Sequence, residues 1–243
     1  MIVVLSGEGP SDIGCCDNAT NSCSAPNFMP GPMTVLLDNL IEERHAYSPL
    51  AAAPNIYRYY SEQALASRAK ARKGNRPFML SGKKHGLETG YFYLNSWMLG
   101  EIALELEQDE NDESIAVLFR DSDGTNSSRL DLWQVKYTSM ESGFKRANYE
   151  RGVPMLPRPK SESWLLCAAK NDPYQNCHLL ENLPGNDRSP NAAKGQLDLA
   201  LNNLTSARGL VDWLKNNTFN SEAAAQQMPS YAAFRDRALE VLS

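Results

Sequence analysis

Two pairs of carboxylates follow two apolar segments of the chain, and their types and spacing could hold a metal ion. Asp121 and Asp123 stand one residue apart, soon after the apolar run at 115–118. Glu8 and Asp12 stand in a similar place, after the first apolar run of the chain. Carboxylate oxygens are hard ligands that suit Mg²⁺ or Mn²⁺. If both runs are strands of one parallel sheet, the four acids lie at its carboxyl edge, where open α/β sheets bind their ligands.

A fifth carboxylate, Glu162, comes after a short apolar segment at 153–156. Phosphoryl transfer requires carboxylates from separate elements, because metal ions must neutralise the charge of the attacking and leaving oxygens. The five acids would hold one Mg²⁺ or Mn²⁺ ion, or two. The alternative is that residues 121–124 form a polar turn and that Glu8 is an isolated loop acid. Each acid alone fits that alternative, whereas their common position at strand ends favours a metal site.

Basic side chains that could bind phosphate form a second group. Arg120 and Arg158 flank the acids, and either could bind a phosphate through two hydrogen bonds or pair with a neighbouring acid. A run without acids at 68–84 is typical of a loop that follows a nucleic-acid backbone. A solvated loop is an equally good interpretation. The basic residues of the run are Arg68, Lys70, Arg72, Lys73, Arg76, Lys83 and Lys84.

Composition restricts the class of protein. The 243 residues are 42% hydrophobic and 22% charged, with a formal net charge of −5, which predicts a soluble globular protein and argues against a general nucleic-acid coat protein. No apolar run approaches the length of a membrane span. The cysteines are odd in number, so we expect reduced thiols and a cytoplasmic location. Their spacing matches no zinc-binding pattern, so we expect no zinc. They are Cys15, Cys16, Cys23, Cys167 and Cys177.

Hydrophobic periodicity predicts an α/β fold. Strands are expected at 2–5, 55–60, 115–118 and 153–156. Amphipathic spacing predicts helices at 33–43, 61–72, 90–108, 132–150 and from Ser161, which we expect to be a helix cap. The segment 14–32 has the composition of a loop. This order predicts a mostly parallel sheet flanked by helices in an α/β domain over 1–170, with a helical C-terminal extension over 171–243 packed on it.

The motifs together resemble the TOPRIM domain of topoisomerases, primases and OLD-family nucleases. Residues 8–12, after the first strand, and residues 121–123, after a later one, match the glutamate and the Asp-x-Asp pair of that family. The Glu-x-x-x-Asp spacing is nearer to the OLD nucleases. Small stand-alone TOPRIM-like bacterial proteins share three further segments, which in this chain are 159–165, 190–194 and 234–235.

The resemblance implies a TOPRIM-like, Rossmann-like fold and a Mg²⁺-dependent nuclease that hydrolyses DNA or RNA phosphodiesters. Glu8 would be a metal ligand and general base, and Asp121 and Asp123 would be metal ligands. Asp12 and Glu162 would complete a second metal position or orient water.

The resemblance also assigns a role to Lys194, which would stabilise phosphate charge in the transition state. A solvated lysine on a helix is an equally good interpretation. Proteins of this kind often act beside an ATPase partner in defence against phage. The rival hypothesis is a non-catalytic regulatory module that holds a metal-bound nucleotide in the acidic pocket and binds a partner such as an ATPase. The presence of Glu8, Asp121 and Asp123 together favours activity.

Overall fold

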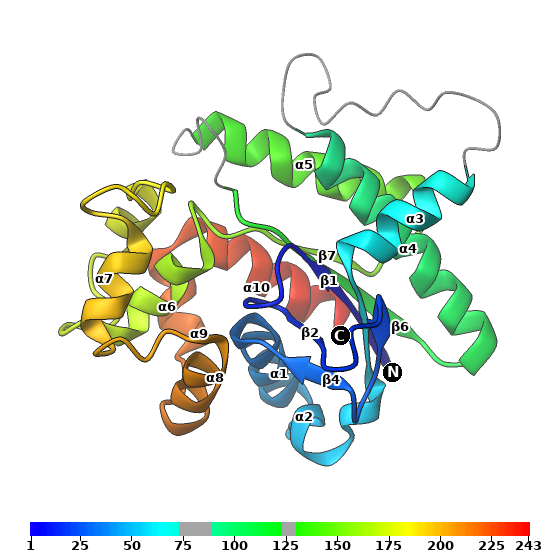
Figure 1. Ribbon diagram of the computed structural model, residues 1–243, viewed down its shortest axis with the longest axis horizontal. Coiled ribbons are helices and arrows are strands. Elements are labelled where there is room, and N and C mark those ends of the chain that lie inside the picture. The colour runs from blue at the N-terminus through cyan, green and yellow to red at the C-terminus, as the bar shows by residue number, and fades with distance from the viewer. Residues whose placement is uncertain (73–88, 123–129) are drawn as a thin grey trace.

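A five-stranded sheet lies at the centre of the molecule (Figure 1). The computed structural model describes residues 1–72, 89–122 and 130–243. Its strands are β1 (Ile2–Gly7), β3 (Ser22–Cys23), β5 (Tyr57–Tyr60), β6 (Ser114–Phe119) and β7 (Gly152–Met155). Their order in the sheet is β3-β5-β1-β6-β7. β5, β1, β6 and β7 are parallel, whereas β3 pairs antiparallel with β5 at one edge. The predicted mostly parallel α/β sheet is therefore confirmed.

The helices agree with the predicted ones to within a few residues. None of those in the described ranges has the length and apolar character that a bilayer crossing requires. The α-helices are α1 (Pro32–His45), α2 (Pro49–Ala52), α3 (Glu62–Arg72), α4 (Gly90–Glu110), α5 (Leu130–Arg146), α6 (Ser161–Ala169), α7 (Ala193–Ala200), α8 (Ala207–Asn216), α9 (Ser221–Gln227) and α10 (Pro229–Val241). Two 3₁₀ turns are also present, η1 (Pro54–Ile56) and η2 (Cys177–Asn182).

The two central strands are buried on both faces. Every residue of β1 and of β6 is buried, as their continuous apolar sequences predict for the interior of a parallel sheet. The strands pair residue by residue, from Ile2 with Ser114 to Gly7 with Phe119. Their carboxyl ends therefore lie side by side, and the residues that follow them are neighbours.

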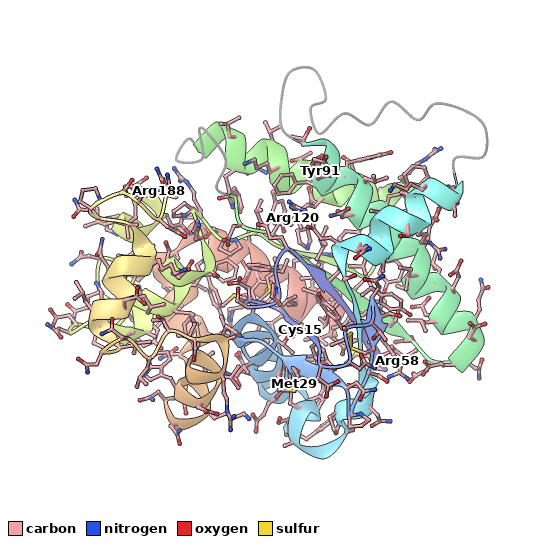
Figure 2. All side chains as sticks on the ribbon, in the orientation of Figure 1. Cys15, Met29, Arg58, Tyr91, Arg120 and Arg188 are labelled. Atoms are coloured by element: carbon pink, nitrogen blue, oxygen red, sulfur yellow. A yellow bond between two sulfur atoms is a disulfide. The ribbon has the colours of Figure 1, made fainter. Side chains whose placement is uncertain are left out.

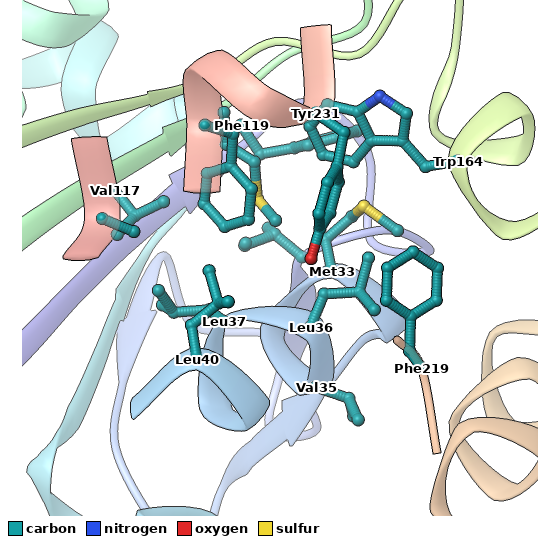
Figure 3. Packing of buried hydrophobic residues seen from close by; sticks show 14 of the residues in the cluster. Met33, Val35, Leu36, Leu37, Leu40, Val117, Phe119, Trp164, Phe219 and Tyr231 are labelled. Carbon is teal, nitrogen blue, oxygen red and sulfur yellow. The ribbon is translucent and has the colours of Figure 1, made fainter. Parts of the chain in front are cut away.

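One face of the sheet packs against α1, α6 and α10. Figure 3 shows Met33, Leu36 and Leu40 of α1 gathered below Phe119 of β6 and Tyr231 of α10. All five side chains are buried. Removing apolar surface from water stabilises a fold by about 25 cal/mol per Å², so this core fixes α1 firmly against the strand ends.

The opposite face packs against α3, α4 and α5. Val4 and Leu118 belong to this core, whereas their strand neighbours Leu5 and Val117 belong to the other, as the two-residue period of a strand requires. α4 and α5 approach closely because Gly143 of α5 has no side chain: a Cβ there would lie 2.3 Å from the carbonyl oxygen of Tyr93.

The described chain after β7 contains helices and no further strand, as the sequence predicts. Trp164 of α6 is fully buried, with its ring stacked on Phe234 at 5.6 Å and edge-on to Tyr231 at 5.1 Å. Its indole N–H donates to the hydroxyl of Ser230 at 2.8 Å. α6 and α10 thus share one core across the expected division at residue 170, and the division itself stays a prediction.

The segment 14–32 is more ordered than the predicted loop. β2 (Gly14–Cys16) and β4 (Phe28–Pro30) form an antiparallel pair, and β3 extends the edge of the main sheet. Gly14 permits the pairing, because its φ is +124° and a Cβ would lie 2.4 Å from the carbonyl oxygen of Met29. Strands of two or three residues are too short to show an alternating pattern, so composition alone indicated a loop.

The expectation of reduced thiols is wrong for four of the five cysteines. Cys16 and Cys23 join β2 to β3, and Cys167 and Cys177 join α6 to η2. Cys15 keeps a free thiol. An odd count does not show which cysteines the fold brings together, and this explains the error. Disulfides persist mainly in oxidising compartments, so the cytoplasmic location stays only a prediction.

Candidate functional site

The acidic residues lie where the order of the strands reverses direction. The chain passes from β1 through α1 to β5 on one side of β1, and then through α3 and α4 to β6 on the other side. Open α/β sheets bind ligands outside the carboxyl ends of the strands at such a point. Glu8 directly follows β1, and Arg120 and Asp121 directly follow β6. Glu8 and Asp121 therefore share one edge of the sheet, as their positions after the two runs predict.

Glu8 and Asp121 are in direct contact. The backbone N–H of Asp121 donates to Oε1 of Glu8 at 2.7 Å, and the guanidinium of Arg120 donates to Oε2 at 2.8 Å. Hydrogen bonds to an ionised carboxylate are among the stronger ones in proteins. The side chain of Glu8 is 31% exposed, so a carboxylate fixed by the neighbouring strand end remains open to solvent.

Ser161 connects the acids that come from different elements. Its backbone N–H donates to Oδ1 of Asp121 at 2.9 Å, and its hydroxyl donates to Oδ1 of Asp12. The same hydroxyl lies 3.4 Å from Oε2 of Glu162. Ser161 is not the helix cap that we expected: Lys160 occupies the N-cap without a side-chain bond, and Asp12 engages the serine hydroxyl instead.

Glu162 has a raised pKa, mainly because it is buried and in part because other acids lie nearby. Burial raises its pKa above the ordinary value near 4.5, and the charge of Asp12 raises the pKa further. A hydrogen bond from its own backbone and the ammonium of Lys160 both lower the pKa. A divalent cation would favour the ionised carboxylate and so reverse the effect of burial.

The stability of the protein should depend on pH through Glu162. Its pKa is higher in the folded than in the unfolded state, so the free energy of unfolding falls as pH rises from about 4.5 through the raised pKa. Glu162→Gln removes the titration. In the presence of a chelator, we expect the variant to gain stability relative to the wild type across that window and to keep the gain at higher pH. Urea unfolding at several pH values measures the difference, and a difference independent of pH would contradict the prediction.

The candidate ligands suit a hard divalent cation by their chemistry. Glu8, Asp12, Asp121 and Glu162 all offer carboxylate oxygens, and the group contains no thiol or imidazole. Across residues 1–72, 89–122 and 130–243, no three acidic, histidine or cysteine side chains are arranged to hold an ion. Asp123 lies outside the described residues. The donor types therefore fit Mg²⁺ or Mn²⁺, and their convergence on one ion stays a prediction.

A divalent cation should stabilise the wild type more than Asp121→Asn. Asparagine keeps the size of the side chain and can still accept from Ser161, but it lacks the charge that a cation requires. A ligand present at a hundred times its Kd stabilises a fold by about 2.7 kcal/mol. We expect Mg²⁺ or Mn²⁺ to raise the Tm of the wild type clearly and that of the variant much less. Asp109→Asn, on the exposed end of α4, is the control, and equal shifts in all three proteins would place the ion elsewhere.

Arg120 balances the charge of the acids. It bridges Glu8 and Glu62 of α3, and its guanidinium carbon lies 5.1 Å from the centre of the Phe92 ring. Figure 2 shows Arg120 between the sheet and the helices that cover it on the α4 and α5 side. Two carboxylates already share the guanidinium, and this reduces the positive charge that Arg120 offers to a phosphate.

Lys136 of α5 is a buried cation at the site that the motif analysis missed. It is 4% exposed, and its Nζ donates to the carbonyl oxygen of Ser122 at 2.7 Å and lies 5.3 Å from the centre of the Phe92 ring. Burying a charge is costly unless it has such partners. The sequence did contain a signal, because Lys136 stands three residues after Trp133 and four before Met140, on the apolar stripe of its helix.

Lys194 belongs to an ion pair beside the site. Nζ of Lys160 lies 2.9 Å from Oδ1 of Asp187, and Nζ of Lys194 lies 4.0 Å from Oδ2 of the same residue. Lys160 directly precedes Ser161, so the two lysines and Asp187 lie beside the acidic group. The Lys194 side chain is 52% exposed, and its proposed action on phosphate stays a prediction.

Arg158 is buried beside the C-terminal helices. It is 8% exposed, and its guanidinium lies 3.4 Å from Oδ1 of Asn182. Burial raises the pKa of Glu181, and the charge of Arg158 opposes that rise. Glu181 in turn accepts from the backbone N–H of Ser230 at 2.8 Å. These contacts connect the segment before α6 to the start of α10, and a phosphate contact for Arg158 stays a prediction.

The first basic residues of the run at 68–84 are ion-paired with α4. Arg68 donates to Glu105 at 2.8 Å, and Arg72 lies 2.7 Å from Glu101. Lys70 is exposed. The pairs fasten α3 to α4 and reduce the charge that the two arginines offer to a nucleic acid. The remaining residues of the run lie outside the described ones: Lys73, Arg76, Lys83 and Lys84.

The fold and the site together define an α/β protein with an acidic group at the carboxyl edge of its sheet. Comparison of the chain with models of known protein families, with curated proteins and with solved structures finds no match in any of the three. We therefore infer the function from the motifs, the strand ends and the contacts described above.

Proposed function

We propose that the chain is a TOPRIM-like, Mg²⁺-dependent nuclease that hydrolyses nucleic-acid phosphodiesters. The observation that carries the proposal is that acids following two separate strands meet at one sheet edge, where a serine at the start of a helix connects them. Glu8 after β1 accepts from Asp121 after β6, and Ser161 at the start of α6 binds both Asp121 and Asp12. Carboxylates brought together from several elements are what metal-assisted phosphoryl transfer requires.

Each residue then has a distinct task. Glu8, Asp121 and Asp123 would hold the first ion, and Asp12 and Glu162 would hold a second ion or orient water. The bound metal would supply Lewis-acid stabilisation and activate water. Glu8 would also act as the general base that accepts a proton from water. Arg120 and Lys194 would offset phosphate charge, whereas buried Lys136 holds the backbone beside Asp121 through Ser122.

The wider setting of this activity follows from the resemblance alone. We propose DNA or RNA as the substrate, an ATPase as the partner protein and antiviral defence as the role. The basic run at 68–84 would follow the nucleic-acid backbone. Of its described arginines, Arg68 and Arg72 would first have to release acids of α4, so we expect Lys70 and the residues after 72 to contribute more.

One observation favours the rival binding module. Both carboxylate oxygens of Glu8 already accept hydrogen bonds, from Asp121 and from Arg120. A site that keeps these bonds would hold a metal-bound nucleotide without exposing a base for hydrolysis. The two functions differ in whether any phosphodiester is cleaved.

Metal-dependent cleavage separates these two functions. We expect the purified protein to cleave at least one member of a panel of single-stranded DNA, duplex DNA and RNA when Mg²⁺ or Mn²⁺ is present, and to stop when EDTA is added. Products resolved on denaturing gels measure the cleavage. Nucleotide binding without cleavage of any substrate, including in the presence of an ATPase partner, would support the binding module and reject the nuclease.

A further inference from the structure

A cavity lies beside α1 and is lined in part by β4. It has a volume of about 1050 Å³ and lies between α1, α2 and the segment that connects α8 to α9. α1 lies between α2 and α8 in Figure 1. The residues that line it include none of the candidate metal ligands. A cavity of this size lies at the upper end of the range of small-molecule sites.

The inner wall of the cavity is apolar. Phe28, Val35, Leu214 and Phe219 line it, and each is largely withdrawn from solvent in the folded chain. Such walls bind the body of a small ligand, while a few polar groups fix its orientation. The charged groups that line the cavity are mostly acidic, because four carboxylates accompany a single ammonium, that of Lys215.

Asp38 is the most informative of these carboxylates. It is 4% exposed and accepts from the hydroxyl of Tyr57 at 2.6 Å, the hydroxyl of Ser48 at 2.5 Å and the backbone N–H of Leu50 at 2.9 Å. All three donors are neutral, and in the described ranges no basic side chain lies within ion-pair distance of Asp38. Glu43, on the same wall, is instead paired with Arg235 at 2.9 Å.

A carboxylate has about four acceptor positions, so three donors leave Asp38 able to accept one more. Its charge sits beside an apolar wall, where electrostatic attraction is stronger than in open water. Glu42, one helical turn further along α1, adds a second carboxylate at the exposed rim. A ligand with a positive charge and an apolar body complements both features.

We propose that this cavity binds a small organic cation, with an aromatic or aliphatic body against Phe28, Val35 and Phe219 and a protonated amine or amidine toward Asp38 and Glu42. The inference does not depend on the nuclease proposal, because the cavity and the acidic edge use different residues. It adds a binding site to the protein whatever the chemistry at the strand ends.

The test compares ligands of the same shape and different charge. Tryptamine, neutral tryptophol and anionic indole-3-propionate are titrated into the full-length protein by calorimetry, with benzamidine as a second cation. We expect tryptamine and benzamidine to bind, tryptophol to bind about tenfold more weakly, and the anion to show no binding. A tenfold ratio corresponds to about 1.4 kcal/mol, near the lower end of what a hydrogen bond to a charged group contributes.

Three variants locate the site. Glu42→Gln on the rim should weaken tryptamine severalfold, and Thr218→Trp, which fills the cavity from its exposed edge, should abolish binding. Asp109→Asn makes the same charge change on distant α4 and should leave the affinity unchanged. All three positions are exposed, so these substitutions leave the fold intact, and the test changes none of the buried hydrogen bonds of Asp38. Equal binding of the three indoles, full binding by Thr218→Trp, or no binding of either cation would overturn the proposal.

Discussion

Glu8→Gln should reduce metal-dependent cleavage by about a hundredfold or more, as the loss of a metal ligand or general base typically does. Glutamine preserves the length of the side chain, and its carbonyl oxygen can still accept from the backbone N–H of Asp121. It removes the charge that the cation requires, and its amide would face the guanidinium of Arg120. Initial rates on the best substrate, measured at saturating Mg²⁺, give the ratio.

Glu62→Gln is the matched control for this experiment. Glu62 is the second carboxylate on Arg120, but it lies on α3 and is not a candidate metal ligand. The control also removes one carboxylate charge that is paired with Arg120. We expect it to retain cleavage within a few fold of the wild type. Equal rates for Glu8→Gln and the wild type would assign the cleavage to another site or to a contaminating nuclease. Equal losses in both variants would show that the charge balance of Arg120 matters and that the position of Glu8 does not.

The part of the site that depends on the sheet could be predicted from the sequence. The runs at 2–5 and 115–118 are apolar at successive positions, which is typical of strands in the interior of a parallel sheet. Adjacent parallel strands of equal length end together, so Glu8 had to lie near Asp121 once the runs were recognised as neighbours. Local pattern and global topology agree at this point.

The parts that depend on contacts distant in sequence could not be predicted. Ser161 binds Asp12 across 149 positions of the chain, and no local pattern reports such a partner. Its position before a helix indicated a cap, and tertiary contact overrode that tendency. The disulfides escaped prediction for the same reason, since counting cysteines does not reveal which thiols approach one another.

Lys136 differs from Ser161 and the disulfides, because the sequence itself indicates its burial. A lysine on the stripe defined by Trp133 and Met140 has to be buried with its charge, which requires acceptors nearby. The pattern of acids at strand ends does not include a cation contributed by the helix that follows β6. A charged residue on an apolar helical face is therefore a second sequence signal for this kind of site.

Gly31→Ala should lower the free energy of unfolding by about 3 kcal/mol, at the upper end of the usual cost of overpacking. A Cβ on Gly31 would lie 2.2 Å from the carbonyl oxygen of Asp12 and 2.8 Å from the backbone nitrogen of Gly14. Both are backbone atoms and cannot rotate away. Gly31 also donates to Ile13 at 3.1 Å, and Met33 donates to the carbonyl oxygen of Asp12 at 2.9 Å. The start of α1 thus holds the segment that carries Asp12 in position through backbone hydrogen bonds. The substitution should therefore displace that acid as well.

Urea unfolding measures the loss, with the slope against denaturant compared between variants to confirm that the transition remains two-state. Gly195→Ala in α7 is the control, because the added Cβ would meet no atom within 4 Å outside the adjacent residues and backbone of its own helix. Alanine is the better helix former there, so the control should gain about 0.5–1 kcal/mol. Because Asp12 is a candidate ligand, Mg²⁺ should also raise the Tm of Gly31→Ala less than that of Gly195→Ala. A Gly31→Ala protein as stable as the wild type would show that α1 does not press on Asp12, and the positioning role assigned to this helix start would then be wrong.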